Sequence, residues 1–174
     1  MFDLADEFLQ PRTGAIRCYR ASLDHPAAGS WSIQIPLLPF SAEDEYEPST
    51  FRPGIEGPMI VEAEISLDFI TLPADHLTTL NRRTFTFPTA FQEGFIDGSI
   101  YLLATHNRVN VTRIDFGPAG KDHITARVHA AFDFEHARTG IRNRAAELDT
   151  TLLFQVVDEL PAPPPTRTGA TGNS

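Results

Sequence analysis

Val61-Glu-Ala-Glu-Ile-Ser-Leu-Asp-Phe69 and Ile124-Thr-Ala-Arg-Val-His-Ala-Ala-Phe-Asp-Phe-Glu135 decide the fold class, because both stretches alternate between apolar and polar residues. Successive side chains of a β-strand point to opposite faces, so each stretch has one apolar face and one polar face. An antiparallel sheet with one apolar face covers it with a second sheet or by closing on itself. The two stretches therefore predict an all-β protein.

Other segments show the same alternation and are separated by turn-forming residues. Trp31 to Ile35 alternates and stops at Pro36, the segment Gly117 to Gly120 is a strong turn signal, and Ala146 to Val157 alternates again. The chain reads as about eight strands at roughly 8–15-residue spacing. This pattern predicts an antiparallel β-sandwich, with a jelly roll as one arrangement of it and a closed barrel as the structural alternative.

The length of 174 residues suits one domain, which we assign to residues 1–160. Apolar residues at helical spacing within residues 1–9 predict a short amphipathic helix or a docking arm that ends before Pro11. A second helical turn is expected after Pro73. Residues 161–174 are rich in proline and polar residues and have little to bury, so we expect a disordered tail.

Composition limits the location of the protein and the kinds of site it can hold. The single cysteine, Cys18, excludes an internal disulfide framework and a multi-cysteine metal cluster. The N-terminus carries acids where a signal peptide carries bases, and no apolar run approaches the roughly 20 residues of a membrane span. We therefore expect a cytoplasmic monomer or simple homo-oligomer that does not bind membranes.

The net charge of −9 is concentrated in the first half of the chain. Residues 1–80 contain 13 acidic and 4 basic residues, whereas residues 81–174 contain 10 of each. An acidic surface repels nucleic acid and anionic membranes and attracts basic partners. This distribution disfavours a nucleic-acid-binding protein and favours a basic protein partner.

Motifs of catalysis and cofactor binding are absent from the sequence. It contains neither Gly-x-Ser-x-Gly nor a phosphate-binding Gly-x-x-x-x-Gly-Lys-Ser/Thr segment. The six histidines do not show His-x-His or His-x-x-x-His spacing, which gives a zinc enzyme little support. We therefore assign no catalytic residue, no metal ligand and no cofactor, and whether the protein is an enzyme stays open.

One candidate binding surface is acidic. Residues two apart on one strand face lie about 7 Å from each other, so carboxylates in such a row can share a cation or bind a basic partner. The simpler interpretation is a solvated sheet face paired with arginines on the neighbouring strands. The candidate residues are the strand row Glu62, Glu64 and Asp68 and the irregular segment that contains Glu43, Asp44 and Glu45.

A second group of candidates combines histidine and arginine. His106 lies near a predicted hairpin, and Arg113 and His129 lie on the polar faces of the strands that follow. The loop from Arg138 to Arg144 is basic and suits a phosphate or carboxylate, unless it is simply exposed. We predict a non-enzymatic binding module for a basic partner. The alternative is a small-molecule site or enzyme whose pocket is lined by His106, Arg113 and His129.

Overall fold

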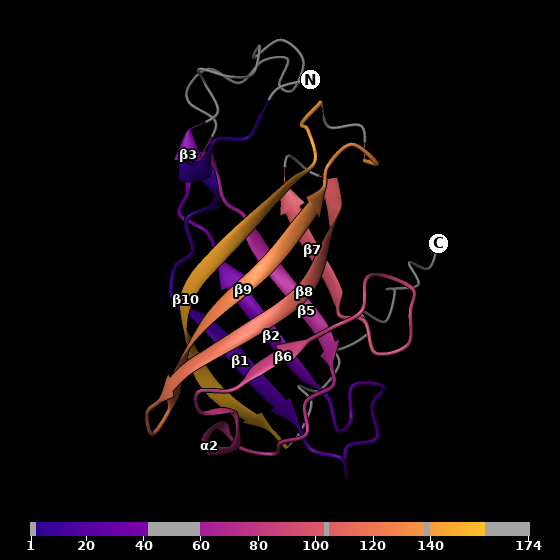
Figure 1. Ribbon diagram of the computed structural model, residues 1–174, viewed down its shortest axis with the longest axis vertical. Coiled ribbons are helices and arrows are strands. Elements are labelled where there is room, and N and C mark those ends of the chain that lie inside the picture. Colours follow the sequence, from indigo (N-terminus) through magenta and orange to yellow (C-terminus); the bar gives the residue numbers. More distant parts are fainter. Residues whose placement is uncertain (1–2, 42–59, 103–104, 138–139, 159–174) are drawn as a thin grey trace, which may run out of the picture.

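The computed structural model describes residues 3–41, 60–102, 105–137 and 140–158 (Figure 1). Most of them belong to one eight-stranded sheet. Its strands are β1 (Gly14–Tyr19), β2 (Trp31–Pro36), β5 (Glu64–Ile70), β6 (Thr84–Thr86), β7 (Asp97–Leu102), β8 (Thr105–Ala119), β9 (His123–Asp133) and β10 (Arg144–Val157). Short elements complete the fold, namely β3 (Phe40–Ser41) paired with β4 (Ile60–Val61), the 3₁₀-helix η1 (Asp6–Leu9) and the helix α2 (Leu77–Leu80).

The sheet closes on itself. The strand order is β6-β8-β7-β5-β2-β1-β10-β9, and β8 also pairs with β9, so all strands except β6 form a ring of seven. The all-β class is therefore confirmed, and a closed barrel takes the place of the expected sandwich. Two features allow the closure. β1 pairs with β10 in parallel, which joins the first and last strands of the chain, and register shifts along β8 allow its 15 residues to bend around the barrel and pair with β9.

The two alternating stretches have different outcomes. Ile124 to Glu135 corresponds to β9, which ends at Asp133. Val61 to Phe69 is divided, because Val61 pairs with Phe40 in the small β3–β4 sheet, whereas β5 begins at Glu64. Most apolar residues of both stretches are buried, as the alternation predicts, but Phe69 and Ala131 are exposed.

The apolar faces of the strands point inward and fill the barrel. Trp31 is fully buried, and its indole N–H donates a hydrogen bond to the carbonyl of Ala74 over 3.0 Å. Phe132 and Phe134 stack with ring centroids 5.5 Å apart. Other fully buried side chains come from all around the ring and include Ile16, Ile33, Ile35, Ile65, Leu67, Ile100, Val109, Ile114, Ile124, Val128 and Leu152.

Both predicted helical turns are present, as η1 and as α2. The expected tail at residues 161–174 lies outside the described residues. No helix in the described ranges has both the length and the apolar character needed to cross a membrane.

The ring separates the polar faces of the two alternating stretches. β5 lies between β2 and β7, and β9 lies between β8 and β10. At least two strands stand between β5 and β9 in either direction around the barrel (Figure 1). Glu62 lies between β4 and β5, so only Glu64 and Asp68 of the predicted acidic row belong to one strand. These two residues do not pair with Arg127 or His129 of β9.

Gly14 lies on β1 between Gln34 of β2 and Leu152 of β10, and it tests how tightly β1 packs against these two neighbours. A Cβ atom there would overlap the backbone oxygen of Gln34, so Gly14→Ala should lower the free energy of unfolding by about 1–3 kcal/mol. Gly120→Ala is the matched control, because its Cβ would meet only the ring of His123, a side chain that is 47% exposed, and not the backbone. Urea unfolding followed by Trp31 fluorescence measures both, and equal effects of the two substitutions would contradict the account.

Candidate functional site

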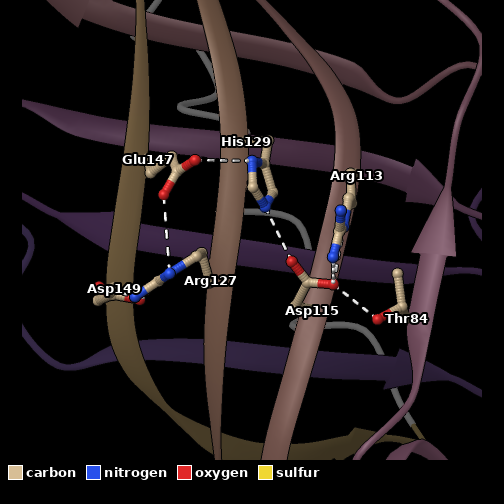
Figure 2. A network of polar contacts seen from close by, with 7 residues as sticks. All are labelled: Thr84, Arg113, Asp115, Arg127, His129, Glu147 and Asp149. Atoms are coloured by element: carbon tan, nitrogen blue, oxygen red, sulfur yellow. Dashed lines mark hydrogen bonds and ion pairs between the residues drawn. The ribbon is translucent and has the colours of Figure 1, made fainter.

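His129 lies between two carboxylates on the outer face of β8, β9 and β10 (Figure 2). Its Nε2 atom is 2.8 Å from an Asp115 oxygen, and its Nδ1 atom is 3.4 Å from a Glu147 oxygen. Strand register explains this position, since His129 is opposite Glu147 on one side and Arg113 on the other. Both ring nitrogens thus face the chain's own carboxylates, which leaves neither directed at a substrate.

Asp115 joins the largest number of these side chains. It accepts hydrogen bonds from the Thr84 hydroxyl at 2.6 Å and the Arg113 Nε atom at 2.8 Å, in addition to its contact with His129 (Figure 2). These donors, with Thr84 the strongest influence, hold the pKa of the Asp115 carboxyl well below its usual value. Asp115 therefore stays ionised at neutral pH, and it ties the edge strand β6 to β8 through Thr84.

Arg127 and Asp149 form the second part of the network. The Arg127 guanidinium contacts both Asp149 oxygens, at 2.8 and 2.9 Å, and lies 3.7 Å from Glu147. This bidentate pairing raises the pKa of Arg127 and lowers that of Asp149. Charges of opposite sign thus alternate across the three strands, and the network neutralises most of its own charge.

Shallow grooves run along this outer face. A groove of about 640 Å³ lies between residues 11–13 and the strands β8, β9 and β10, and its lining includes Gly117, Thr125 and Thr151. A second groove of about 360 Å³ lies beside His129 and is lined by the small residues Ala131 and Ala145. Within the described ranges, no three His, Cys, Asp or Glu side chains form a group that could hold a metal ion.

The acidic row has a different environment. Glu64 is opposite Pro36, and Asp68 is opposite Asp97, so their strand partners are not arginines. Partial loss of hydration, together with repulsion from Asp97, raises the pKa of Asp68. The expected cross-strand arginine partners are thus missing from the strands beside β5.

Glu62 and Glu64 line one groove of about 330 Å³ together with Tyr101 and Arg12. Both glutamates are exposed, as is half of the Tyr101 side chain. Glu43, Asp44 and Glu45, the other predicted acidic residues, lie outside the described residues.

The His/Arg candidates divide between two places. Arg113 and His129 meet through their shared contact with Asp115. His106 instead lies beside Tyr101, with ring centroids 5.1 Å apart, and is seven residues from Arg113 along β8, or roughly 23 Å of strand. The structure therefore does not gather the three residues around one pocket.

Sequence reasoning missed several residues of these surfaces. Glu147 and Asp149 alternate with apolar residues in β10, which was a usable signal for their outward direction. Their contact with Arg127 and His129 depends on the β9–β10 register, which periodicity does not specify. Asp97 is followed by Gly98, a pair of residues typical of a turn, although both belong to β7.

Asp115→Asn tests the role of Asp115 in the network. The substitution should lower the free energy of unfolding by about 1–2 kcal/mol at pH 7, because it removes the charged acceptor of three side chains. A carboxyl with a lowered folded-state pKa stabilises above its unfolded pKa of about 4, and this contribution disappears as the pH falls. The gap between wild type and variant should therefore narrow from pH 6 to pH 2.

Asp158→Asn is the control for this series, because that exposed carboxylate pairs only with the exposed Arg20 among the described residues. Its effect should stay within about 0.5 kcal/mol. A pH-independent gap for Asp115→Asn, or a loss no larger than that of the control, would contradict the assigned role.

Comparison with known proteins identifies no relative of the chain. No protein-family model matches the chain, and no match was found among curated proteins or solved structures. Functional inference therefore rests on the geometry of the described residues.

Proposed function

We propose that the chain is a non-enzymatic binding module that presents an acidic surface, formed by Glu62, Glu64, Asp68 and Asp97, to a basic protein partner. The observation that supports it most is the neighbourhood of β5. The polar-face residues of β5 have four register partners, and none of these partners carries a positive charge. They are Pro36, Gln34, Ser99 and Asp97.

The charges of the acidic surface are available to a partner. All four carboxylate residues are exposed, and no ion pair engages them within the described part of the chain. Arg17 lies near enough to lower the pKa of Asp68, but its hydrogen bonds go to Gln34 and Gln155. A cation from a partner would relieve the repulsion between Asp68 and Asp97 and pair with the two glutamates.

Exposed apolar side chains flank the acidic surface. Tyr101, 50% exposed, lines the groove that holds Glu62 and Glu64, and Ile60, 56% exposed, lies two residues before Glu62. Interfaces commonly combine an aromatic anchor with surrounding charge, and the ring face of Tyr101 also attracts cations. The surface therefore suits a partner with lysine or arginine next to apolar residues.

The alternative, a small-molecule or enzymatic site lined by histidine and arginine, has weaker support. The groove of about 640 Å³ has the size of a ligand site, but it is an open feature of the outer surface. Arg113 and His129 are engaged with carboxylates of the chain, and His106 lies elsewhere on β8.

Charge reversal tests the proposal directly. Glu62→Lys/Glu64→Lys should weaken binding of a synthetic peptide of alternating lysine and leucine by about tenfold, because attraction becomes repulsion at two positions of the groove. Raising the salt concentration from about 0.05 to 0.5 M should weaken wild-type binding in the same direction. Fluorescence anisotropy of the labelled peptide measures both effects.

Asp24→Lys/Glu93→Lys is the matched control, since it changes the net charge equally at exposed positions that do not line the groove of Glu62 and Glu64. It should change the affinity by less than about threefold. If both double variants lose affinity equally, binding follows net charge alone and the assigned surface is wrong. Unchanged binding after reversal of Glu62 and Glu64 would end the proposal.

A further inference from the structure

Two arginines hold the N-terminal segment against one end of the barrel. Arg144 donates hydrogen bonds to the carbonyl oxygen of Leu4 and to the carboxylate of Asp6, and Arg142 lies 3.4 Å from the carboxylate of Asp3. We call residues 3–9 the cap. Figure 1 shows its start at the same end of the barrel as the connection between β9 and β10. The basic loop thus binds carboxylates of its own chain.

The other side of the cap is apolar. Leu4 and Leu9 are only 2% and 4% exposed, and the Phe8 ring stacks on Phe40 with centroids 4.2 Å apart. The cap is therefore an acidic amphipathic segment whose apolar residues are buried and whose acids meet arginines. Burial of an apolar face, together with charge pairing at its edge, is the way in which grooves bind short amphipathic peptides.

Side chains hold the cap more than the backbone does. Within the described residues, the backbone hydrogen bond of the cap is local, from the Phe8 N–H to the Ala5 carbonyl. Backbone pairing with the barrel starts at the next residues, where Gln10 accepts from Leu38 and Pro11 bridges to Leu37. A segment held this way opens at lower free energy than the strands of the ring.

The cap leaves one donor of its site unused. The Nε atom of Arg144 is buried and has no hydrogen-bond acceptor among the described residues, although the other two guanidinium nitrogens bind Leu4 and Asp6. A carboxylate that approaches a guanidinium from its side engages Nε and one Nη together. A ligand with such a carboxylate would satisfy Arg144 better than the cap does.

We propose that this end of the barrel, with Arg142 and Arg144 at its centre, is a binding site for an acidic amphipathic segment of another protein. The cap occupies the site in cis and competes with that segment. The ligand follows the pattern of the cap, Asp-Leu-x-Asp-x-x-Leu, over residues 3–9. This site binds acidic ligands, whereas the acidic surface binds basic ones. The two proposals are therefore tested independently of each other.

A competition experiment on the full chain tests the site. The probe is a labelled synthetic peptide with the sequence of residues 1–12, titrated into the wild type and into Asp3→Asn/Asp6→Asn. The variant loses two acidic contacts of the cap and keeps both arginines, so it should bind the probe about tenfold more tightly, because an attached competitor acts at high effective concentration.

Adding Arg144→Gln to the double variant should remove this gain, whereas adding Arg20→Gln, which breaks an exposed ion pair with Asp158, should keep it. Trp31 fluorescence during thermal unfolding shows whether each variant is folded. If Arg144→Gln fails to fold, Arg142→Gln takes its place, since that side chain is 56% exposed, and should lower the affinity at least threefold. Equal affinity of the wild type and Asp3→Asn/Asp6→Asn, or a gain that survives loss of the arginine, would overturn the proposal.

Discussion

Closure of one twisted sheet is the constraint on which the other features of this protein depend. The parallel pairing of β1 with β10 and the antiparallel pairing of β8 with β9 give every strand of the ring two hydrogen-bonded neighbours. Because side chains alternate along each strand, closure sends one set into the interior and the other to the outer surface. The apolar set fills the interior, and the polar set has to find its partners on the outside.

Closure also explains why the two candidate surfaces differ. It places β8, β9 and β10 side by side, so Asp115, His129 and Glu147 meet and the charges of this face neutralise one another. β5 has β2 and β7 as neighbours, which present proline, glutamine, serine and Asp97. The first surface therefore stabilises the barrel, whereas the second retains charge that a partner can use.

The inward and outward directions of side chains were predictable from the sequence, because alternation reports them directly. The buried positions of β9 and β10 and the turns that separate the strands follow from this local signal. The short helices were predictable in place, from apolar spacing in residues 1–9 and from Pro73, although α2 begins at Leu77, where His76 caps it.

Strand partners were not predictable, because pairing is a property of the whole sheet. Alternation does not show that β1 runs parallel to β10, that Asp68 faces Asp97, or that Glu147 reaches His129. The contact of Arg144 with Asp6 joins residues 138 apart in sequence, and only the closed fold brings them together.

Nuclear Overhauser effects between backbone protons test the closure most directly. The account predicts cross-peaks from Ile16 to Phe154, across β1 and β10, and from Ile114 to Val128, across β8 and β9, in the same dilute sample. Together with contacts across the other pairs of neighbouring strands in the ring, both sets require a closed ring. Loss of either set, with the remaining strand contacts intact, would show an open sheet and contradict the account.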